Sequence, residues 1–445
     1  MTARGTALEA LLQVEVNEGY SNLVLNKALK KENMEPRENA LASALFYGVL
    51  ERKLTLDYII SQISKIEIAK IEIPVLLILE MAIYQVLFLD KIPESAAVNE
   101  AVILAKTMGE GRASGFINGV LRNFLRKKET LLNTQPKGDR IFSLSIQYSC
   151  PQRLIRMWEK FYGQKITEDL LKTLKTRPPI FARVNTTLIN REELCESLEK
   201  EGIEAETFPF LEGTILLKNT GSLEASPSFQ KGLFHIQDLS SQLCCEMVGP
   251  KAGERILDVC AAPGGKSFTM AEKMEDQGNL EAHDLYKGRV RLIASGAFRL
   301  HLSCISASVR DAENSEGVLP LADRVLCDAP CSGLGILRRK PEIRYKSAKT
   351  LDSLPSLQYR ILCNNAGFVQ YKGKMVYSTC TLNPQENHAV VERFLKSHPK
   401  FSPIALNLPQ GFSHLIDEPE NEWTIFPQMH NSDGFFISAF IRQRE

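Results

Sequence analysis

Two cysteines beside predicted strands are the residues best suited to covalent chemistry. Cys331 lies in the segment Asp328–Gly335, and Cys380 lies in the segment Tyr377–Thr381. A thiolate is a strong nucleophile and attacks carbon centres readily. A single cysteine is more often a small buried hydrophobic residue, and we interpret Cys327 in this way. Two thiols at neighbouring strand ends, by contrast, predict that they converge on one reaction centre.

A small-residue turn predicts a ligand loop. The segment from Cys260 to Lys266 joins a predicted strand to a predicted helix and contains Gly264 and Gly265. Glycines let the backbone approach a ligand, and a helix N-terminus favours a carboxylate or phosphate. A P-loop requires glycine where this chain has Cys260, and the nicotinamide pattern G-x-G-x-x-G is absent. S-adenosylmethionine is the cofactor that remains. Asp284, near the end of the next strand, is placed to bind ribose hydroxyls or to cap a helix.

The elements that position these residues alternate between strand and helix. The sequence predicts strands at 255–260, 279–283, 324–327 and 374–377, and helices at 266–274 and 289–300. This alternation is typical of an α/β fold, an open parallel sheet with helices on both faces. Ligands of such sheets bind at the carboxyl ends of the strands. The thiols and the loop are therefore expected at one edge of the sheet.

Two further domains are predicted before this one. Apolar residues recur at helical spacing from Arg4 to about Lys128, which predicts an all-α bundle of four to six helices over residues 1–135. Residues 140–232 combine helical segments with short strand-like ones, such as 181–185 and 214–217, and predict a small α+β module. The α/β domain then covers residues 233–445.

The amino-acid composition limits the class of protein to which the chain can belong. The 445 residues are 44% hydrophobic and 24% charged, as in folded multidomain proteins. The most apolar stretch, 73–89, contains Glu80 and Gln85 and is too short to cross a membrane. Because no signal peptide is visible, we expect a cytoplasmic protein. The ten cysteines include no C-x-x-C pair, so we expect no metal and reduced thiols.

Any affinity for RNA must come from local clusters, because the net charge is only +1. Basic residues outnumber acidic ones between Lys106 and Arg140, and Arg122, Arg126 and Lys127 are candidate phosphate contacts. A solvated helix face explains such a run equally well. Further candidate RNA contacts are Arg183 and Asn185 in the predicted small module.

The combination of C-A-A-P-G-G-K, D-A-P-C-S-G-x-G and S-T-C-T resembles the RNA 5-methylcytosine methyltransferases. Residues 93–100 and 115–123 resemble the helical RNA-binding domain of the NusB family. Together they resemble the bacterial RsmB (Sun/Fmu) branch, which acts on 16S ribosomal RNA. The fold implied is a NusB-like bundle, a small α+β module and a Rossmann-like methyltransferase domain. Residues 433–436 also fit the last motif of the family.

The resemblance implies roles for individual residues. It implies that Cys380 is the nucleophile, that Cys331 assists product release, and that Asp328 contacts both the cofactor and the base. The implied S-adenosylmethionine contacts are Cys260, Ala261, Ala262, Pro263, Gly264, Gly265, Lys266, Asp284, Asp311 and Asp328. Carbon 5 of cytosine is a poor nucleophile, and thiolate addition at carbon 6 would activate it. Spacing does not decide which thiol attacks, so this assignment depends on the resemblance.

Alternatives remain at this point. The same chemistry could act on transfer RNA, and the chain could also be a non-catalytic antitermination or assembly factor. An oxidoreductase is disfavoured because the nicotinamide pattern is missing. Our prediction is a monomeric enzyme acting on 16S ribosomal RNA, either free or in an assembly intermediate, with unstacked cytosine as its target.

Overall fold

The computed structural model describes residues 2–17, 21–32, 34–221, 223–314, 319–429 and 431–443. Contacts divide the chain into two compact units. The first unit comprises Met1–Lys175 and Leu337–Lys346, and the second comprises Thr176–Ile336 and Ser347–Glu445. The first unit thus extends past residue 135, because α7 (Arg140–Tyr148) packs on α8 (Gln152–Thr173) and on α3 (Pro36–Ile63). The predicted limits of the three domains stay predictions.

The first unit is helical, as its apolar spacing predicts. Prolines mark helix starts, because a missing backbone N–H costs nothing in the first turn: α3 begins at Pro36, and Pro74 lies in the first turn of α4. The helices are α1 (Ala3–Asn17), α2 (Ser21–Glu32), α3 (Pro36–Ile63), α4 (Ile73–Phe88), α5 (Glu94–Thr107), α6 (Ser114–Asn133), α7 (Arg140–Tyr148) and α8 (Gln152–Thr173), with 3-10 turns η1 (Ile68–Lys70) and η2 (Gly111–Ala113). Six α-helices up to residue 133 agree with the expected bundle.

A short segment from the C-terminal half completes this helical unit. It contains the 3-10 turn η4 (Pro341–Tyr345), which packs against α3. The Arg344 side chain is only 1% exposed, and its guanidinium donates to the carbonyls of Ser149 at 3.0 Å and Glu51 at 3.4 Å. The Tyr345 hydroxyl donates to the Leu50 carbonyl at 3.0 Å. A buried guanidinium is tolerated only when such acceptors surround it.

The second unit begins with a small four-stranded antiparallel sheet in the order β2-β3-β1-β4. Its strands are β1 (Ile180–Val184), β2 (Glu204–Thr207), β3 (Thr214–Lys218) and β4 (Phe234–Ile236), and its helical elements are α9 (Arg191–Lys200), η3 (Leu223–Ala225) and α10 (Pro227–Gln230). Apolar side chains of β1, β3 and α9 form its core. The expected α+β module is present here.

The large sheet of the second unit has eight strands among the described residues, in the order β10-β12-β9-β8-β5-β6-β7, with β11 paired to β12. The strands are β5 (Arg255–Asp258), β6 (Asn279–Asp284), β7 (Ile305–Val309), β8 (Ala322–Asp328), β9 (Val369–Thr379), β10 (Phe401–Pro403), β11 (Glu422–Ile425) and β12 (Phe435–Arg442). Strands β5 to β9 pair in parallel, as predicted, whereas β12 joins β9 antiparallel. The four predicted strands correspond to β5, β6, β8 and β9.

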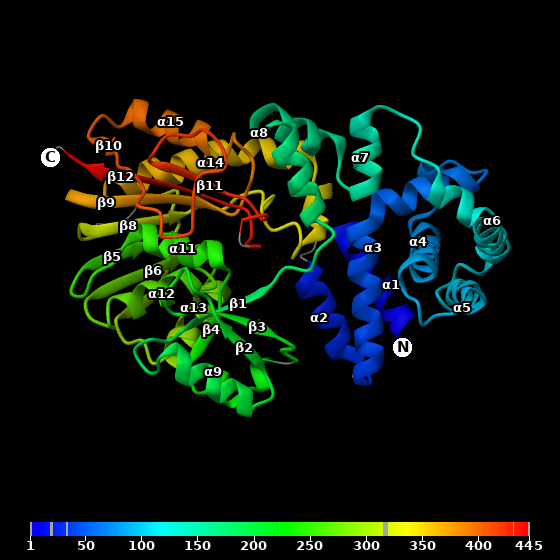
Figure 1. Cartoon of the computed structure of the whole chain (residues 1–445), viewed down its shortest axis with the longest axis horizontal. Coiled ribbons are helices and arrows are strands. Elements are labelled where there is room, and N and C mark those ends of the chain that lie inside the picture. The colour runs from blue at the N-terminus through cyan, green and yellow to red at the C-terminus, as the bar shows by residue number, and fades with distance from the viewer. Residues whose placement is uncertain are drawn as a thin grey trace. The chain divides into compact units, whose positions relative to one another are not determined.

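Helices cover both faces of the large sheet (Figure 1). One face carries α11 (Leu239–Val248), α12 (Gly265–Lys273) and α13 (Lys287–Arg299), and the other carries α14 (Ala348–Ala366) and α15 (His388–Ser397). This arrangement brings the carboxyl ends of β5, β8 and β9 to one edge of the sheet.

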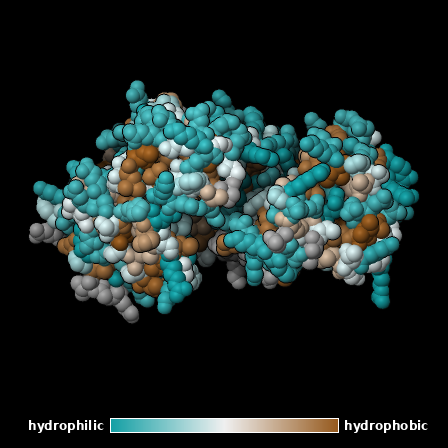
Figure 2. All heavy atoms as spheres, turned by 90° about the horizontal axis from the view of Figure 1, so that it is seen from below, coloured by the Kyte–Doolittle hydropathy of each residue, from teal (hydrophilic) through white to brown (hydrophobic). Residues whose placement is uncertain are grey.

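Hydrophilic residues cover most of the face seen in Figure 2, and hydrophobic residues gather there in separate patches. Among the helices in the described part of the chain, none is both long and apolar enough to cross a membrane. The apolar helix α4 instead contributes Leu79, Ile83 and other side chains to the core of the first unit.

Candidate active site

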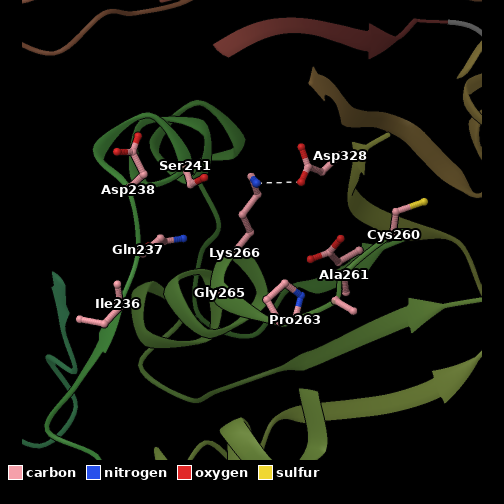
Figure 3. A pocket seen from close by; sticks show the side chains of 12 residues that line it. Ile236, Gln237, Asp238, Ser241, Cys260, Ala261, Pro263, Gly265, Lys266 and Asp328 are labelled. Atoms are coloured by element: carbon pink, nitrogen blue, oxygen red, sulfur yellow. Dashed lines mark hydrogen bonds and ion pairs between the residues drawn. The ribbon is translucent and has the colours of Figure 1, made fainter. Parts of the chain in front are cut away.

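A pocket of about 210 Å³ lies at the carboxyl end of β5, and Figure 3 shows the side chains around it. The loop after β5 forms one wall, and the connection from β4 to α11 forms another. Gly264 has a φ of +114°, a backbone angle that favours glycine, directly before α12 begins. The lining residues are Ile236, Gln237, Asp238, Ser241, Asp258, Cys260, Ala261, Ala262, Pro263, Gly265, Lys266 and Asp328.

An ion pair crosses this pocket. The Lys266 ammonium donates to Oδ2 of Asp328 at 2.7 Å, and the Ser378 hydroxyl donates to the other carboxylate oxygen at 2.8 Å. Although burial alone would lower the pKa of Lys266, the Asp328 carboxylate raises it above its usual range. The ammonium also lies 5.0 Å from the ring centre of Phe435 on β12, within reach of a cation–π interaction. Lys266 is therefore a fixed positive charge.

The sequence interpretation did not select five of the lining residues, which are Ile236, Gln237, Asp238, Ser241 and Asp258. Asp258 ends β5 with 1% exposure, accepts a hydrogen bond from the Ser267 hydroxyl at 2.7 Å, and has its pKa raised to about 7 by burial. Gln237 follows β4, and its Oε1 accepts from the Thr269 hydroxyl at 2.6 Å. Its buried amide nitrogen points into the pocket (Figure 3) and has no hydrogen-bond partner among the described residues. Gln237 belongs to no motif that indicates a ligand, whereas Asp258 lies two residues before the predicted ligand loop and its position at a strand end could have identified it.

The two thiols converge, as the strand ends predicted. The Sγ atoms of Cys331 and Cys380 lie 3.1 Å apart, and both side chains are partly exposed. The Cys380 carbonyl accepts the Gly335 amide at 3.0 Å, which ties the two loops together. The hydrogen bond with Cys380 and burial raise the pKa of Cys331 well above the usual value, assisted by nearby negative charge. These contacts favour the protonated form of Cys331.

The last motif of the chain, residues 433–436, contacts the loop that carries Cys331. Gly434 donates its amide to the Gly335 carbonyl at 2.9 Å. A Cβ atom on Gly335 would lie 1.9 Å from the Gly434 carbonyl oxygen, so this position requires glycine. Cys327, by contrast, is fully buried in β8, as predicted for a core residue.

The remaining acidic candidates lie outside the pocket lining. Asp284 is buried at the end of β6, and it lies 3.4 Å from the Arg289 guanidinium and accepts the Tyr286 amide at 3.2 Å. Asp311 is exposed beyond β7 and accepts the Glu313 amide at 2.9 Å. Asp284 ends β6, the neighbour of β5 in the sheet, and Asp311 follows β7, the next strand beyond β6. Their ribose and adenine contacts remain predictions.

The candidate RNA contacts fall into two groups. Arg122, Arg126 and Lys127 are exposed on α6. Arg183 and Asn185 are 4% and 0% exposed, so the expectation that they face RNA is corrected. The Arg183 guanidinium donates to Glu272 at 3.1 Å, and the Asn185 amide donates to two backbone carbonyls. Within the second unit, Arg183 thus joins the small sheet to α12, and Asn185 joins it to the end of α13.

This fold and site define a class of protein. An open, mostly parallel sheet with a glycine-containing loop before its first helix and acids at the following strand ends is the Rossmann-like methyltransferase fold. Within the described segments, His, Cys, Asp and Glu side chains form no group of three or more able to hold a metal ion.

Comparisons with known proteins agree on the family. Residues 245–441 match the family described as 16S rRNA methyltransferase RsmB/F, residues 1–126 match the NusB family, and residues 150–224 match the ferredoxin-like domain of RsmF/B-like methyltransferases. The probable ribosomal RNA small subunit methyltransferase B of Bacillus subtilis is 36% identical over 99% of both chains. The ribosomal RNA small subunit methyltransferase B of Erwinia tasmaniensis is 29% identical over 97% of this chain and 96% of its own.

Solved structures show the same fold. The crystal structure of PH0851 has a TM-score of 0.82 and 24% identity, and the match covers 99% of each chain. NSun6 from Pyrococcus horikoshii, solved with an S-adenosylmethionine analogue, has a TM-score of 0.61 and 21% identity over 66% of this chain and 99% of its own. The chain belongs to the RsmB/F methyltransferase family. It is an S-adenosylmethionine-dependent methyltransferase.

Proposed function

We propose that this enzyme methylates carbon 5 of a cytosine in 16S ribosomal RNA through a covalent bond between Cys380 and the base. The observation that carries the proposal is the pair of thiols 3.1 Å apart, at strand ends beside the Lys266–Asp328 ion pair. A methyltransferase acting on an oxygen or an amine needs no thiol, because those atoms are nucleophilic already. Two converging thiols suit a carbon that must first be activated.

The residues around the pocket fit S-adenosylmethionine. The unpaired amide nitrogen of Gln237 and the Lys266 ammonium offer donors to a carboxylate, and the start of α12 adds a favourable dipole. Asp258 and Asp284 are acceptors suited to an ammonium group or to ribose hydroxyls. When bound, the cofactor supplies an electrophilic methyl group.

The two thiols divide the remaining chemistry. The Cys380 thiolate adds to carbon 6 and forms a carbon–sulfur bond, while Asp328 holds the base at ring nitrogen 3. The electron pair released to carbon 5 makes that carbon nucleophilic. After methylation, a base must remove the carbon 5 proton so that the bond to Cys380 breaks and the ring double bond returns. Cys331, whose sulfur lies 3.1 Å from that of Cys380, is placed to accept this proton in its thiolate form.

The substrate assignment follows the relatives. The names of the two full-length relatives specify the small ribosomal subunit, and both the NusB-like and the methyltransferase parts of the chain are matched. Transfer RNA is the second candidate, because the same thiol chemistry suits any unstacked cytosine. An enzyme with a ribosomal RNA substrate would work in the cytoplasm.

Transfer of radiolabelled methyl from S-adenosylmethionine tests the proposal. Protein-free 16S ribosomal RNA and total transfer RNA are offered in parallel, and the labelled nucleoside is identified by mass spectrometry. Label in 5-methylcytidine from 16S ribosomal RNA alone supports the proposal. Label in transfer RNA would support the mechanism but assign a different substrate. Label on an atom other than carbon 5 of cytosine would contradict the role of Cys380.

A further inference from the structure

We propose that Glu386 and Asn387, neighbours in the turn before α15, are positioning residues that hold the Cys331 and Cys380 loops against each other. The inference rests on the proposed function, because it assigns a purpose to the thiol pair of that site. It concerns the segment Asn383-Pro384-Gln385-Glu386-Asn387, which follows the Cys380 loop directly. Neither side chain lines the pocket.

Glu386 fixes the loop that carries Cys331. Its carboxylate is 0% exposed, and Oε2 accepts the Ser332 backbone amide and the Gln358 side-chain amide, each at 2.8 Å. The Gln358 amide nitrogen also donates to the Pro330 carbonyl at 2.9 Å. The residues directly before and after Cys331 are therefore both held by this one pair of side chains. A buried carboxylate with amide donors is a strong anchor, because its hydrogen bonds are charge-assisted.

Asn387 fixes the loop that carries Cys380 in the same way. Its buried side chain accepts from the Thr379 hydroxyl at 2.6 Å and donates to the Thr381 carbonyl at 3.0 Å. Thr379 and Thr381 flank Cys380. One asparagine thus links the Thr379 side chain and the Thr381 backbone on either side of the nucleophile.

Two further contacts join these anchors. The Ser332 and Thr381 hydroxyls lie 2.6 Å apart, and the Asn383 amide donates to Oε1 of Glu386 at 2.8 Å. The two thiol loops and the turn therefore form one hydrogen-bonded network. Because the turn places Glu386 and Asn387 next to each other, a shift of either residue would change the distance between the two sulfur atoms.

The charge of Glu386 also acts on the Cys331 thiol. It belongs to the negative groups that raise the pKa of Cys331, after the hydrogen bond with Cys380 and burial. A neutral side chain at position 386 would make ionisation of Cys331 easier. Glu386 therefore both holds the Cys331 loop in place and favours the protonated form of Cys331.

If residues 383–387 had only a structural role, a different experimental result would be expected. If the segment only supports the start of α15, then its substitution lowers stability without changing which thiol is reactive. The Glu386→Gln substitution distinguishes a role in positioning the thiols from a purely structural role. It preserves size, removes the charge, and places an amide N–H against backbone or side-chain donors.

The experiment measures alkylation of Cys331 and Cys380 by iodoacetamide against pH, resolved by peptide mass spectrometry, together with kcat and KM for S-adenosylmethionine. In the wild type we expect alkylation at neutral pH to fall on Cys380. In Glu386→Gln we expect both thiols to be alkylated and kcat to fall about 100-fold, with KM nearly unchanged. Glu386→Asp should restore the selectivity in part.

Matched controls are available in the same unit. Glu422→Gln neutralises another buried carboxylate, which pairs with His388 at 2.9 Å, and Gln385→Ala alters an exposed neighbour in the same turn. Both should keep wild-type alkylation and kcat. If Glu386→Gln fails to fold, Gln358→Leu tests the same anchor by removing its bond to the Pro330 carbonyl.

Wild-type thiol selectivity and kcat in the folded Glu386→Gln variant would overturn the inference. The alkylation assay contains no RNA, so its result does not depend on which nucleotide is methylated. Activity in a Cys380→Ala variant would instead remove the proposed function, whatever the alkylation pattern. The two failures are thus distinguishable.

Discussion

Lys266 and Asp328 form a 2.7 Å ion pair between the first turn of α12 and the end of β8. The other oxygen of Asp328 accepts the Ser378 hydroxyl on β9, so this carboxylate joins three elements of the sheet edge. Asp328 lines the proposed cofactor pocket and lies three residues before Cys331 in the chain. The position of one carboxylate thus affects both halves of the reaction.

Asp328→Asn should therefore impair both activity and stability. An amide offers Lys266 only one neutral acceptor and leaves a buried ammonium poorly compensated, which typically costs about 3 kcal/mol. We expect methyl transfer to fall about 100-fold and the Tm to drop. Radiolabel transfer and thermal unfolding measure these effects. Asp352→Asn, at an exposed position on α14, is the control and should leave both unchanged; an active Asp328→Asn enzyme would contradict the assigned role.

Cys380→Ala should abolish methylation and retain cofactor binding. The side chain does not line the pocket, so S-adenosylmethionine should bind the variant with nearly wild-type affinity in calorimetry. Cys195→Ala serves as control, because Cys195 is a free thiol on α9 of the small module. Normal turnover by Cys380→Ala would refute its assignment as nucleophile.

Cys331→Ala should trap the enzyme on its product. Without a base for the carbon 5 proton, the bond between Cys380 and carbon 6 persists after methylation. We expect an enzyme–RNA adduct that survives denaturing electrophoresis and disappears in the Cys331→Ala, Cys380→Ala double variant. A fully active single variant that forms no adduct would exclude the release role.

The basic face of α6 should contribute to RNA affinity. Arg122 and Arg126 are four residues apart, which places them on one side of the helix, and both are exposed. Replacing both by Gln should weaken RNA binding and lower the slope of log K against log salt by about 1.4 to 2. Filter binding at several salt concentrations measures this. Lys27→Gln with Lys30→Gln on α2 is the charge-matched control, and an equal loss in both double variants would indicate a general charge effect.

Acid should destabilise the second unit through His283. Burial and the Arg310 charge lower the pKa of this imidazole from 6.5 to about 4, although Glu281 lies 3.6 Å from its Nε2 atom. Because the folded-state pKa is depressed, its contribution to stability is present above pH 6.5 and is lost as the pH falls towards 4, by on the order of 3 kcal/mol. The Tm of wild type should therefore fall more steeply in this range than that of His283→Gln. Parallel Tm curves would contradict this.

Much of the α/β domain is visible in the sequence because its signals are local. The strand before Cys260, the glycines of the loop and the thiols at strand ends each lie within a few residues of the feature they define. The predicted elements differ from β5, α12 and β6 only at their ends. The edge strands β10 and β11 are three and four residues long, too short for a periodic pattern.

The missed site residues depend on distant partners. Gln237 lines the pocket because β4 ends there, and its neighbours in the sequence indicate no ligand, whereas Asp258 lies two residues before the predicted ligand loop and was not selected. Arg183 was predicted to contact RNA because it is a basic residue in the small module. In the structure it forms an ion pair with Glu272, which lies far along the chain. Charge type alone does not distinguish a surface contact from a buried ion pair.

The segment 337–346 has a consequence for biosynthesis. The buried Arg344 and the partly buried Tyr345 donate hydrogen bonds to carbonyl groups of α3 and of the α7–α8 connection. During translation, these helices emerge long before residues 337–346 are made. These contacts of the helical unit can therefore form only after most of the chain has been synthesised.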